Sequence, residues 1–362
     1  MLRGLTYQPT GAIIAAPTTS LPETVGGERN WDYRFGWIRD ASLTMQALWV
    51  AACPDEASRF LRWMINAAGA STTGPGLQVM YGVGGEHDLS ERELDHLEGW
   101  RASRPVRVGN GAWRQTQLDI FGELLDAVWR LVEQLDDLDD TARAFLRDVA
   151  STAAARWREP DHGIWEARSE PRHYLYSKLM CWVALDRAVA LAEFLRSDEQ
   201  LAGWVSERDE LRAQILTNGW SDAVGAFTQS FGADDLDASA LLLAVTGFLP
   251  MSDPRMQATL ERIVEQLSTA DGLLYRYRSE DGLDGDEATF TLCSYWLVQC
   301  LALAGERDRA IALFEKVTSY ANDVGLLSEE IDVASGELLG NFPQAFSHVG
   351  LVNAVWTIGP SP

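Results

Sequence analysis

The sequence predicts an all-α fold in which helices pair into a double-layered ring. Apolar residues recur at helical spacing along most of the 362-residue chain, whereas strand patterns are few and brief. Short and long connections also alternate along the chain. In an up-and-down ring the long connections would gather at one end, and long loops are usually functional, so we expect the site at that end.

The predicted elements follow one another from end to end. After a short first element near residues 1–8, the segment RDASLTMQALWVAA carries an apolar stripe of Leu43, Ala47 and Val50, and Asp40 or Ser42 can cap its start. The other helical patterns cover residues 55–69, 113–135, 139–157, 174–195, 199–219, 236–248, 254–268, 287–304, 306–322 and 343–357. The count reaches about twelve elements.

Two kinds of helix alternate in this series. Residues 174–195, 236–248 and 287–304 are almost continuously apolar, which is typical of helices that are buried on most sides. The helices that flank them carry charged faces. A ring with an inner, apolar layer and an outer, amphipathic layer would produce this alternation.

The strand signals AIIAAPTT, LQVMYGV and GLLYRYRS predict hairpin arms or extended loops. They fall in or beside the long connections. These connections cover residues 9–38, 70–112, 158–173, 221–235, 269–286 and 323–342.

Composition restricts the partners and the cofactors. Thirty basic residues against fifty-three acidic ones give a net charge of −23, which repels phosphate backbones and anionic lipid, so neither nucleic acid nor a membrane is an expected partner. The apolar run from Ala12 to Ala16 is too short for a signal peptide or a membrane span, which favours a cytoplasmic protein. Cysteines and histidines are dispersed, so we expect no metal and no cofactor.

No linker or composition break divides residues 1–362, which predicts a single domain.

The first candidate catalytic group is Glu166, which follows Trp165 in a long loop. A carboxyl group held against an indole ring is desolvated, which raises its pKa and suits a general acid. The alternative is an ordinary solvated loop glutamate.

The second candidate is the adjacent pair Glu329 and Glu330, which follows two leucines in another long loop. Two neighbouring carboxylates cannot both be comfortable when buried, so at least one should project into solvent or a polar site. The alternative is a helix N-terminus or surface charge.

The third candidate is YRFGWIRDAS, where Arg39 and Asp40 follow a cluster of aromatic residues. The alternative is a surface salt bridge or a helix cap. The ring would bring all three candidates to one mouth in a chain with fourteen tryptophans. An acidic, tryptophan-rich mouth fits glycoside hydrolysis, which needs two carboxyl groups and polar groups for the sugar hydroxyls.

Four motifs carry a family resemblance. ERNWDYRFGWIRDASLT, GIWEARS, YRYRSEDG and LLSEEIDVASGELLGNFPQAFSH, in this order, resemble the glucoamylase-type inverting glycoside hydrolases of family 15. The resemblance runs from about residue 6 to the C-terminus. It implies an (α/α)6 barrel with long loops at one end. Bacterial relatives usually have an N-terminal β-sandwich domain, and because the first barrel element comes at the start of this sequence, we expect that domain to be absent or the N-terminus to be shortened.

The resemblance also implies residue roles. Glu166 would be the general acid and Glu329 the general base. The substrate-binding residues would be Tyr33, Trp37, Arg39, Asp40, Trp113, Trp165, Arg276 and Glu330, with Arg39 and Asp40 on the nonreducing-end glucose and Glu330 in support. One departure is Ala167, which stands where fungal glucoamylases carry a second glutamate that contacts the sugar beyond the cleaved bond.

The function that we expect is an exo-acting, inverting α-glucosidase for a small oligosaccharide, with an α-1,6 linkage of the isomaltose type favoured. Trehalase or α-1,4 glucoamylase of the same family is the alternative. An inverting sugar phosphorylase and a non-catalytic sugar-binding protein are further alternatives, and the oligomeric state stays open.

Overall fold

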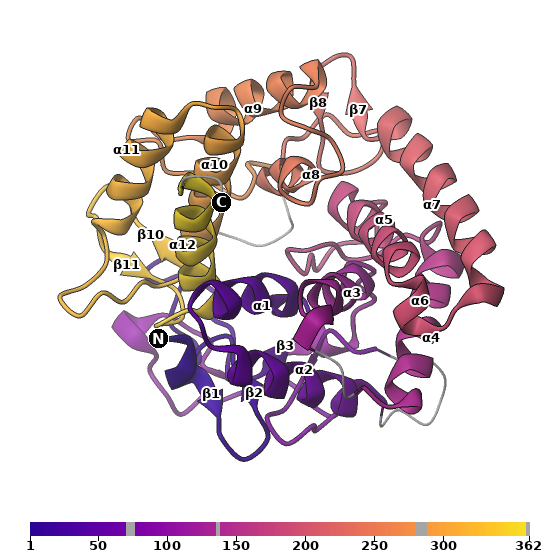
Figure 1. The fold of residues 1–362 in the computed structure, drawn as a ribbon. Helices are drawn as coiled ribbons and strands as arrows, with labels where there is room; N and C mark the ends of the chain where they lie inside the picture. The colour runs from indigo at the N-terminus through magenta and orange to yellow at the C-terminus, as the bar shows by residue number, and fades with distance from the viewer. Residues whose placement is uncertain (70–76, 135–137, 280–287, 360–362) are drawn as a thin grey trace.

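The helices of the computed structural model form a closed ring in two layers (Figure 1). The structure describes residues 1–69, 77–134, 138–279 and 288–359. Most buried apolar side chains of these residues belong to one continuous core. The predicted long connections 70–112 and 269–286 lie partly outside the described residues, as does the first residue of the predicted helix 287–304.

Each layer of the ring has six members in the described residues, and an outer element precedes its inner partner in the sequence. The outer elements are the 3₁₀ turn η1 (Leu2–Leu5) and the helices α2 (Pro54–Gly69), α4 (Asp140–Arg156), α7 (Asp198–Asn218), α9 (Pro254–Leu267) and α11 (Arg307–Thr318). The inner elements are α1 (Asp40–Val50), α3 (Ile120–Arg130), α5 (Leu175–Ala190), η5 with α8 (Ala238–Leu241 and Leu242–Val245), α10 (Thr291–Leu303) and α12 (Ala345–Ile358). The architecture is the (α/α)6 barrel that the sequence predicts.

Burial separates the two layers. Every residue from Thr291 to Leu301 in α10 is buried, because α8, α11 and α12 surround this helix. The outer helix α7 buries only Trp204, Leu211 and Ile215. The three segments predicted as inner helices are confirmed by this pattern.

Some predicted helices are interrupted in the structure. Within the described residues, the predicted helix 113–135 is shorter, because η3 (Gly111–Arg114) and an extended Gln115 precede α3 and η4 (Val132–Gln134) follows it. Residue 135 lies outside the described residues. The segment 174–195 breaks after α5 and continues as the short helix α6 (Ala192–Leu195). The segment 236–248 begins as a 3₁₀ turn, whose start is capped by the Asp237 side chain.

Strands are short and lie in the loops. Two-stranded antiparallel pairs join β1 (Thr6–Tyr7) to β2 (Ala12–Ile13), β3 (Gly36–Trp37) to β4 (Met80–Tyr81), β5 (Arg92–Glu93) to β6 (Arg107–Val108), and β7 (Trp220–Ser221) to β8 (Ala226–Phe227). A three-stranded sheet has the order β11 (Leu338–Leu339), β10 (Glu330–Ile331) and β9 (Thr289–Phe290). The predicted arm 272–279 forms only isolated bridges, from Leu274 to Ser268 and from Tyr277 to Asp237.

The described long loops enter the inner helices at their N-terminal ends. The loop before α1 contains β3, and the loop before α12 contains β10 and β11. Within the described residues, no helix is long and apolar enough to cross a membrane.

Helices α3 and α5 approach each other most closely at Gly122. A Cβ atom at this position would lie 2.1 Å from the Met180 carbonyl oxygen, so an added methyl group must push the two inner helices apart. We expect Gly122→Ala to lower the free energy of unfolding by about 3 kcal/mol, measured by chemical denaturation. The matched control is Gly203→Ala on the open face of α7, where nothing lies within 4 Å of the added Cβ atom. That variant should keep or gain stability, because alanine favours helix over glycine. Equal stability of the two variants would contradict the close packing of α3 on α5.

Candidate active site

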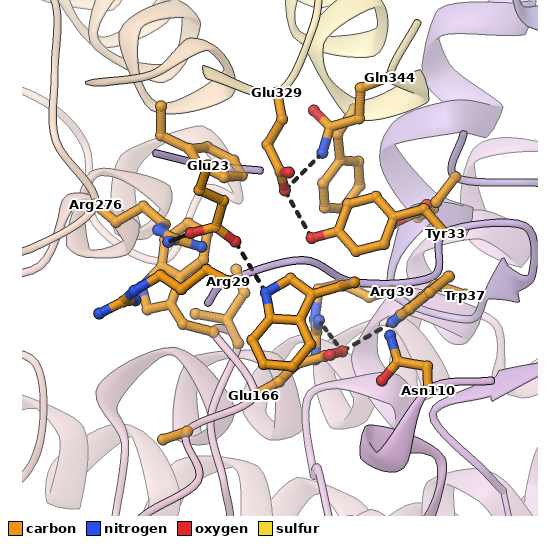
Figure 2. Close-up of a pocket in the computed structure, with 18 of the residues that line it drawn as sticks. Glu23, Arg29, Tyr33, Trp37, Arg39, Asn110, Glu166, Arg276, Glu329 and Gln344 are labelled. Atoms are coloured by element: carbon orange, nitrogen blue, oxygen red, sulfur yellow. Dashed lines mark hydrogen bonds and ion pairs between the residues drawn. The ribbon is translucent and has the colours of Figure 1, made fainter. Parts of the chain in front are cut away.

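A cavity of about 900 Å³, including its open mouth, lies at the N-terminal ends of the inner helices (Figure 2). Loops that precede α1, α3, α5, α10 and α12 all contribute to its wall. Eight of the ten predicted site residues line it, namely Tyr33, Trp37, Arg39, Asp40, Trp165, Glu166, Arg276 and Glu329. The prediction that long loops gather at one end of the ring is therefore confirmed for the loops that line this cavity.

Glu166 lies in a tight turn in front of α5. Its backbone has a φ of 58°, a left-handed conformation that is strained for a residue other than glycine. Its Oε1 accepts hydrogen bonds from the indole N–H of Trp37 at 2.8 Å and from Nη1 of Arg39 at 3.3 Å. Since both donors bind Oε1, a proton on this carboxyl group would sit on Oε2.

Trp165 does not hold Glu166 in the way that the sequence suggests. Its indole N–H donates to Oδ2 of Asp237 at 2.8 Å, and its ring packs edge-on against Phe290 with centroids 5.4 Å apart. The indole that is hydrogen-bonded to Glu166 belongs to Trp37. The expectation of a carboxyl group held against the Trp165 ring is thus corrected, because the turn directs the two adjacent side chains to different partners.

Arg39 and Asp40 are both buried where α1 begins, with 4% and 8% of their surface exposed. The alternative of a surface salt bridge is therefore excluded. Nε of Arg39 donates to Oδ2 of Asp119 at 2.6 Å, and its Nη2 donates to Gln117. Burial raises the pKa of Asp40 to about 8, a shift that Arg39 opposes and Glu166 increases.

Glu329 is buried directly before β10, and its two oxygens differ. Oε1 accepts hydrogen bonds from the Tyr33 hydroxyl at 2.7 Å and from Nε2 of Gln344 at 3.1 Å. Oε2 has no hydrogen bond of good geometry to the described residues, although the backbone N–H of Asn341 is near enough to favour the ionised form. Burial and the charge of Glu23 raise the pKa of Glu329 to about 8 against the opposing effects of Arg276 and Tyr33.

The two carboxyl groups occupy opposite walls of the cavity and are connected through aromatic side chains (Figure 2). Tyr33 binds Glu329, Trp37 binds Glu166, and the Tyr33 and Trp37 rings meet edge-on with centroids 5.4 Å apart. A group bound between the two walls could receive a proton on one side and meet a water molecule on the other. The arrangement has the components that glycoside hydrolysis needs.

Two predicted binding residues, Glu330 and Trp113, are not among the described residues that line the cavity. Glu330 is fully buried on β10, with Oε1 at 3.6 Å from Nη2 of Arg276. Trp113 packs in a small apolar cluster that includes Trp37. Both side chains therefore support residues of the cavity wall. The geometry does not place either of them in contact with a ligand.

Other lining residues were missed by sequence reasoning. Glu23, Arg29 and Trp31 come from the loop of residues 20–32, and Asn110, Arg168 and Gln344 come from other loops. The loop 20–32 has neither a helical nor a strand period, and only its end overlaps the ERNW motif. Its contacts depend on partners more than 200 residues away, such as Arg276, which no local pattern reveals.

A family model described as glycosyl hydrolases family 15 matches residues 1–356. The chain belongs to this family. Because members of this family are glycosyl hydrolases, two carboxyl groups on opposite walls of the cavity are the kind of site that such a chain is expected to have. Within the described residues, no group of three or more His, Cys, Asp or Glu side chains could hold a metal ion.

Curated relatives extend the comparison. The chain is 49% identical over 358 residues to a protein named trehalase from Mycolicibacterium smegmatis, with 98% of this chain and 53% of the relative covered. It is 48% identical to a trehalase from Mycobacterium tuberculosis, with 98% and 52% covered, and 40% identical to a trehalase from Thermoplasma volcanium, with 97% and 56% covered. The chain spans about half the length of these relatives.

Solved structures share the fold. A protein titled "Glycosidase Wild Type" matches with a TM-score of 0.77 at 20% identity, covering 99% of this chain and 94% of the other. A bacterial glucoamylase complexed with acarbose matches with a TM-score of 0.78 at 16% identity, covering 99% and 54%. At these identities the likeness supports the barrel architecture alone.

The raised pKa of Glu329 predicts a pH-dependent cost of stability. In the unfolded chain this carboxyl group ionises near its ordinary pKa of 4.5, but in the fold it ionises only near 8. The neutral form therefore suits the fold, and stability is lost as the pH rises from about 5 to about 8. We expect Glu329→Gln to be more stable than the wild type at pH 9, by on the order of a few kcal/mol, and to differ much less at pH 5.

The measurement is the free energy of unfolding at several pH values for the wild type, Glu329→Gln and the control Glu261→Gln, an exposed position on α9. Asp40 titrates in all three proteins, so the difference between them isolates Glu329. A difference between Glu329→Gln and the wild type that stays constant from pH 5 to 9 would show that the Glu329 pKa is not raised.

Proposed function

We propose that this site hydrolyses the α-glucosidic bond of trehalose with inversion at the attacked carbon. The observation that carries the proposal is the pair Glu166 and Glu329 on opposite walls of one cavity, each held by an aromatic side chain of the same loop. Inverting glycosidases use one carboxylic acid and one carboxylate with room for water between them. We expect an exo-acting enzyme. The cavity has a floor formed by buried residues, so a sugar chain can enter only by its end and is cleaved at its terminal unit.

The chemistry divides between the two carboxyl groups. Glu166 gives the proton on its Oε2 to the glycosidic oxygen, and the bond between this oxygen and the sugar carbon breaks. The Glu329 carboxylate takes a proton from a water molecule, and the water oxygen bonds to the same carbon from the opposite face. Tyr33 and Gln344 hold Oε1 of Glu329, and Oε2 is buried against Gly340, so the carboxyl group keeps a set orientation. After one turnover Glu166 is ionised and Glu329 is protonated, and exchange with solvent restores both.

The pKa of Glu329 has a consequence for this role. A general base must be ionised, and a base with a pKa of about 8 is mostly protonated at lower pH. Its ionised form is, however, a stronger base than an ordinary carboxylate. Over the pH range in which Glu166 keeps its proton, kcat/KM should therefore rise with pH as Glu329 becomes ionised.

Arg39 and Asp40 on the floor would hold hydroxyl groups of the terminal glucose. Both are buried, and Asp119 fixes the guanidinium of Arg39 so that its remaining N–H groups keep a set direction. The ring of Tyr33 can pack against the apolar face of the sugar. Glu330 acts through Arg276 in this account.

The proposed substrate, trehalose, differs from the isomaltose-type substrate that the sequence analysis favours. The isomaltose preference finds no support, because the curated relatives with 38% to 49% identity carry the names trehalase, trehalase 1 or trehalase 2. Trehalose, a small disaccharide with two terminal glucose units, also suits a pocket of this size. Since the chain covers about half of these relatives, the activity of the whole protein is part of the proposal.

The anomers released from trehalose test the stereochemistry. Inversion gives one β-glucose from the attacked unit and one α-glucose from the leaving unit, in equal amounts, whereas retention gives α-glucose alone. We expect proton NMR of the first turnovers to show equal α and β signals before mutarotation. In ¹⁸O-labelled water, the label should enter the β product only. Early formation of α-glucose alone would contradict the assignment, and faster cleavage of isomaltose or maltose than trehalose would contradict the substrate.

Gly340 tests the placement of the base. Its φ is 77°, and a Cβ atom there would lie 2.7 Å from Cβ and 2.8 Å from Oε2 of Glu329. We expect Gly340→Ala to displace this carboxyl group and to lower kcat for trehalose by about 100-fold. The matched control is Gly336→Ala in the same hairpin, which has a φ of 72° but room for the methyl group, with the nearest atom at 3.6 Å. Both variants carry the same backbone strain, so equal kcat values would argue against Glu329 as the base.

A further inference from the structure

A third carboxyl group, Glu23, lines the cavity and has no role in the mechanism described so far. It is 2% exposed and comes from the loop 20–32. Its Oε1 accepts a hydrogen bond from the indole N–H of Trp31 at 3.0 Å, and its Oε2 accepts one from Nη2 of Arg276 at 2.8 Å (Figure 2). Each oxygen thus binds a different residue of the cavity wall.

Arg276 is shared between two buried carboxyl groups. Its guanidinium lies 2.8 Å from Glu23 and 3.6 Å from Glu330, and both partners are almost fully buried. It also lies over the rings of Trp165 at 5.5 Å and Phe290 at 4.9 Å. Burying a carboxylate costs free energy unless a cation pairs with it. One guanidinium can balance the charge of one carboxylate, so two buried carboxyl groups beside Arg276 indicate that the second has a role other than charge pairing.

The loop 20–32 is attached to the hairpin that carries Glu329. The N–H of Gly340 donates to the carbonyl of Pro22 at 2.8 Å, and Nδ2 of Asn341 donates to the carbonyl of Trp31 at 2.9 Å. On its outer side the loop is held by Nη1 of Arg107, which donates to the carbonyl of Glu28 at 3.0 Å. These contacts hold Glu23 in a set position relative to Glu329.

We propose that Glu23 is a positioning residue of this site: it holds Arg276 and Trp31 on the cavity wall and places a negative charge beside Glu329. This inference rests on the proposed function, in which Glu329 is the base. The charge adds to the effect of burial in favouring the protonated form of Glu329, so Glu23 helps to set the pH range in which the base is ionised. The other charged and titratable groups around Glu329 are Tyr33, Arg276, Glu330, and Glu166 and Arg29 across the cavity.

The sign of the effect follows from the charges. Glu23 raises the pKa of Glu329, whereas Arg276 lowers it. Removing the charge of Glu23 lowers the pKa of Glu329 directly, and it leaves Arg276 with one carboxylate fewer to neutralise, which acts in the same direction. Both effects extend the activity to lower pH. The loss of the bond to Arg276 at the same time weakens sugar binding.

The test compares Glu23→Gln, Glu23→Asp and Glu28→Gln with the wild type in the pH profile of kcat/KM for trehalose. In Glu23→Gln the rising limb of kcat/KM should move to lower pH by about one unit, because a nearby like charge is removed. Its KM should rise by about tenfold or more, because a hydrogen bond between charged groups is lost. Glu23→Asp keeps the charge, so its rising limb should stay in place while KM rises. Glu28 is exposed on the same loop, and Glu28→Gln should change neither quantity.

A second readout does not depend on catalysis. The melting temperature of the wild type should fall between pH 6 and pH 9 as Glu329 becomes ionised, and this fall should be smaller in Glu23→Gln. A rising limb and a fall in melting temperature that are both unchanged in Glu23→Gln would overturn the proposal and leave Glu23 a structural residue. If the fall shrinks in Glu23→Gln but no variant, wild type included, cleaves trehalose, then the proposed function fails and the charge effect of Glu23 stands.

Discussion

Burial of the Glu329 carboxyl group is the constraint on which the rest of the site depends. A carboxyl group with 1% of its surface exposed loses most of its hydration, and burial raises its pKa to about 8. Two donors on one oxygen, Tyr33 and Gln344, replace part of the lost water. The absence of a side chain at Gly340 leaves the space that the carboxyl group fills, and the barrel supplies the walls that exclude solvent.

The two carboxyl groups of the site have different environments, which suits two different tasks. Glu166 has a side chain that is 21% exposed and is bound by an indole N–H and a guanidinium, whereas Glu329 is enclosed. Sequence reasoning expected desolvation at Glu166, next to Trp165. The structure has the strongly buried carboxyl group on the opposite wall, because the turn at Glu166 directs the Trp165 ring to Asp237 and into the core.

The sequence predicts the barrel well, because its evidence is local. Helical periodicity identified both layers, and the continuously apolar segment of α10 identified an inner helix. The motifs located Glu166, Glu329, Arg39 and Asp40. Contacts that join distant loops were not predictable in this way. Glu23 binds Arg276 across 253 positions, Arg39 binds Asp119 across 80, and Trp113 packs against an apolar cluster whose members Trp37 and Met80 are paired strand residues far apart in the sequence.

The central claim is that Glu166 and Glu329 act on one sugar from opposite sides, with a water molecule at Glu329. The most direct measurement is a crystal structure of the Glu166→Gln variant with trehalose bound. We expect the substituted side-chain amide at the glycosidic oxygen, a water molecule between the Glu329 carboxyl group and the sugar carbon, and the amide and the carboxyl group about 6.5 to 9.5 Å apart. A separation near 5 Å with no space for water, or trehalose bound away from both residues, would contradict the account.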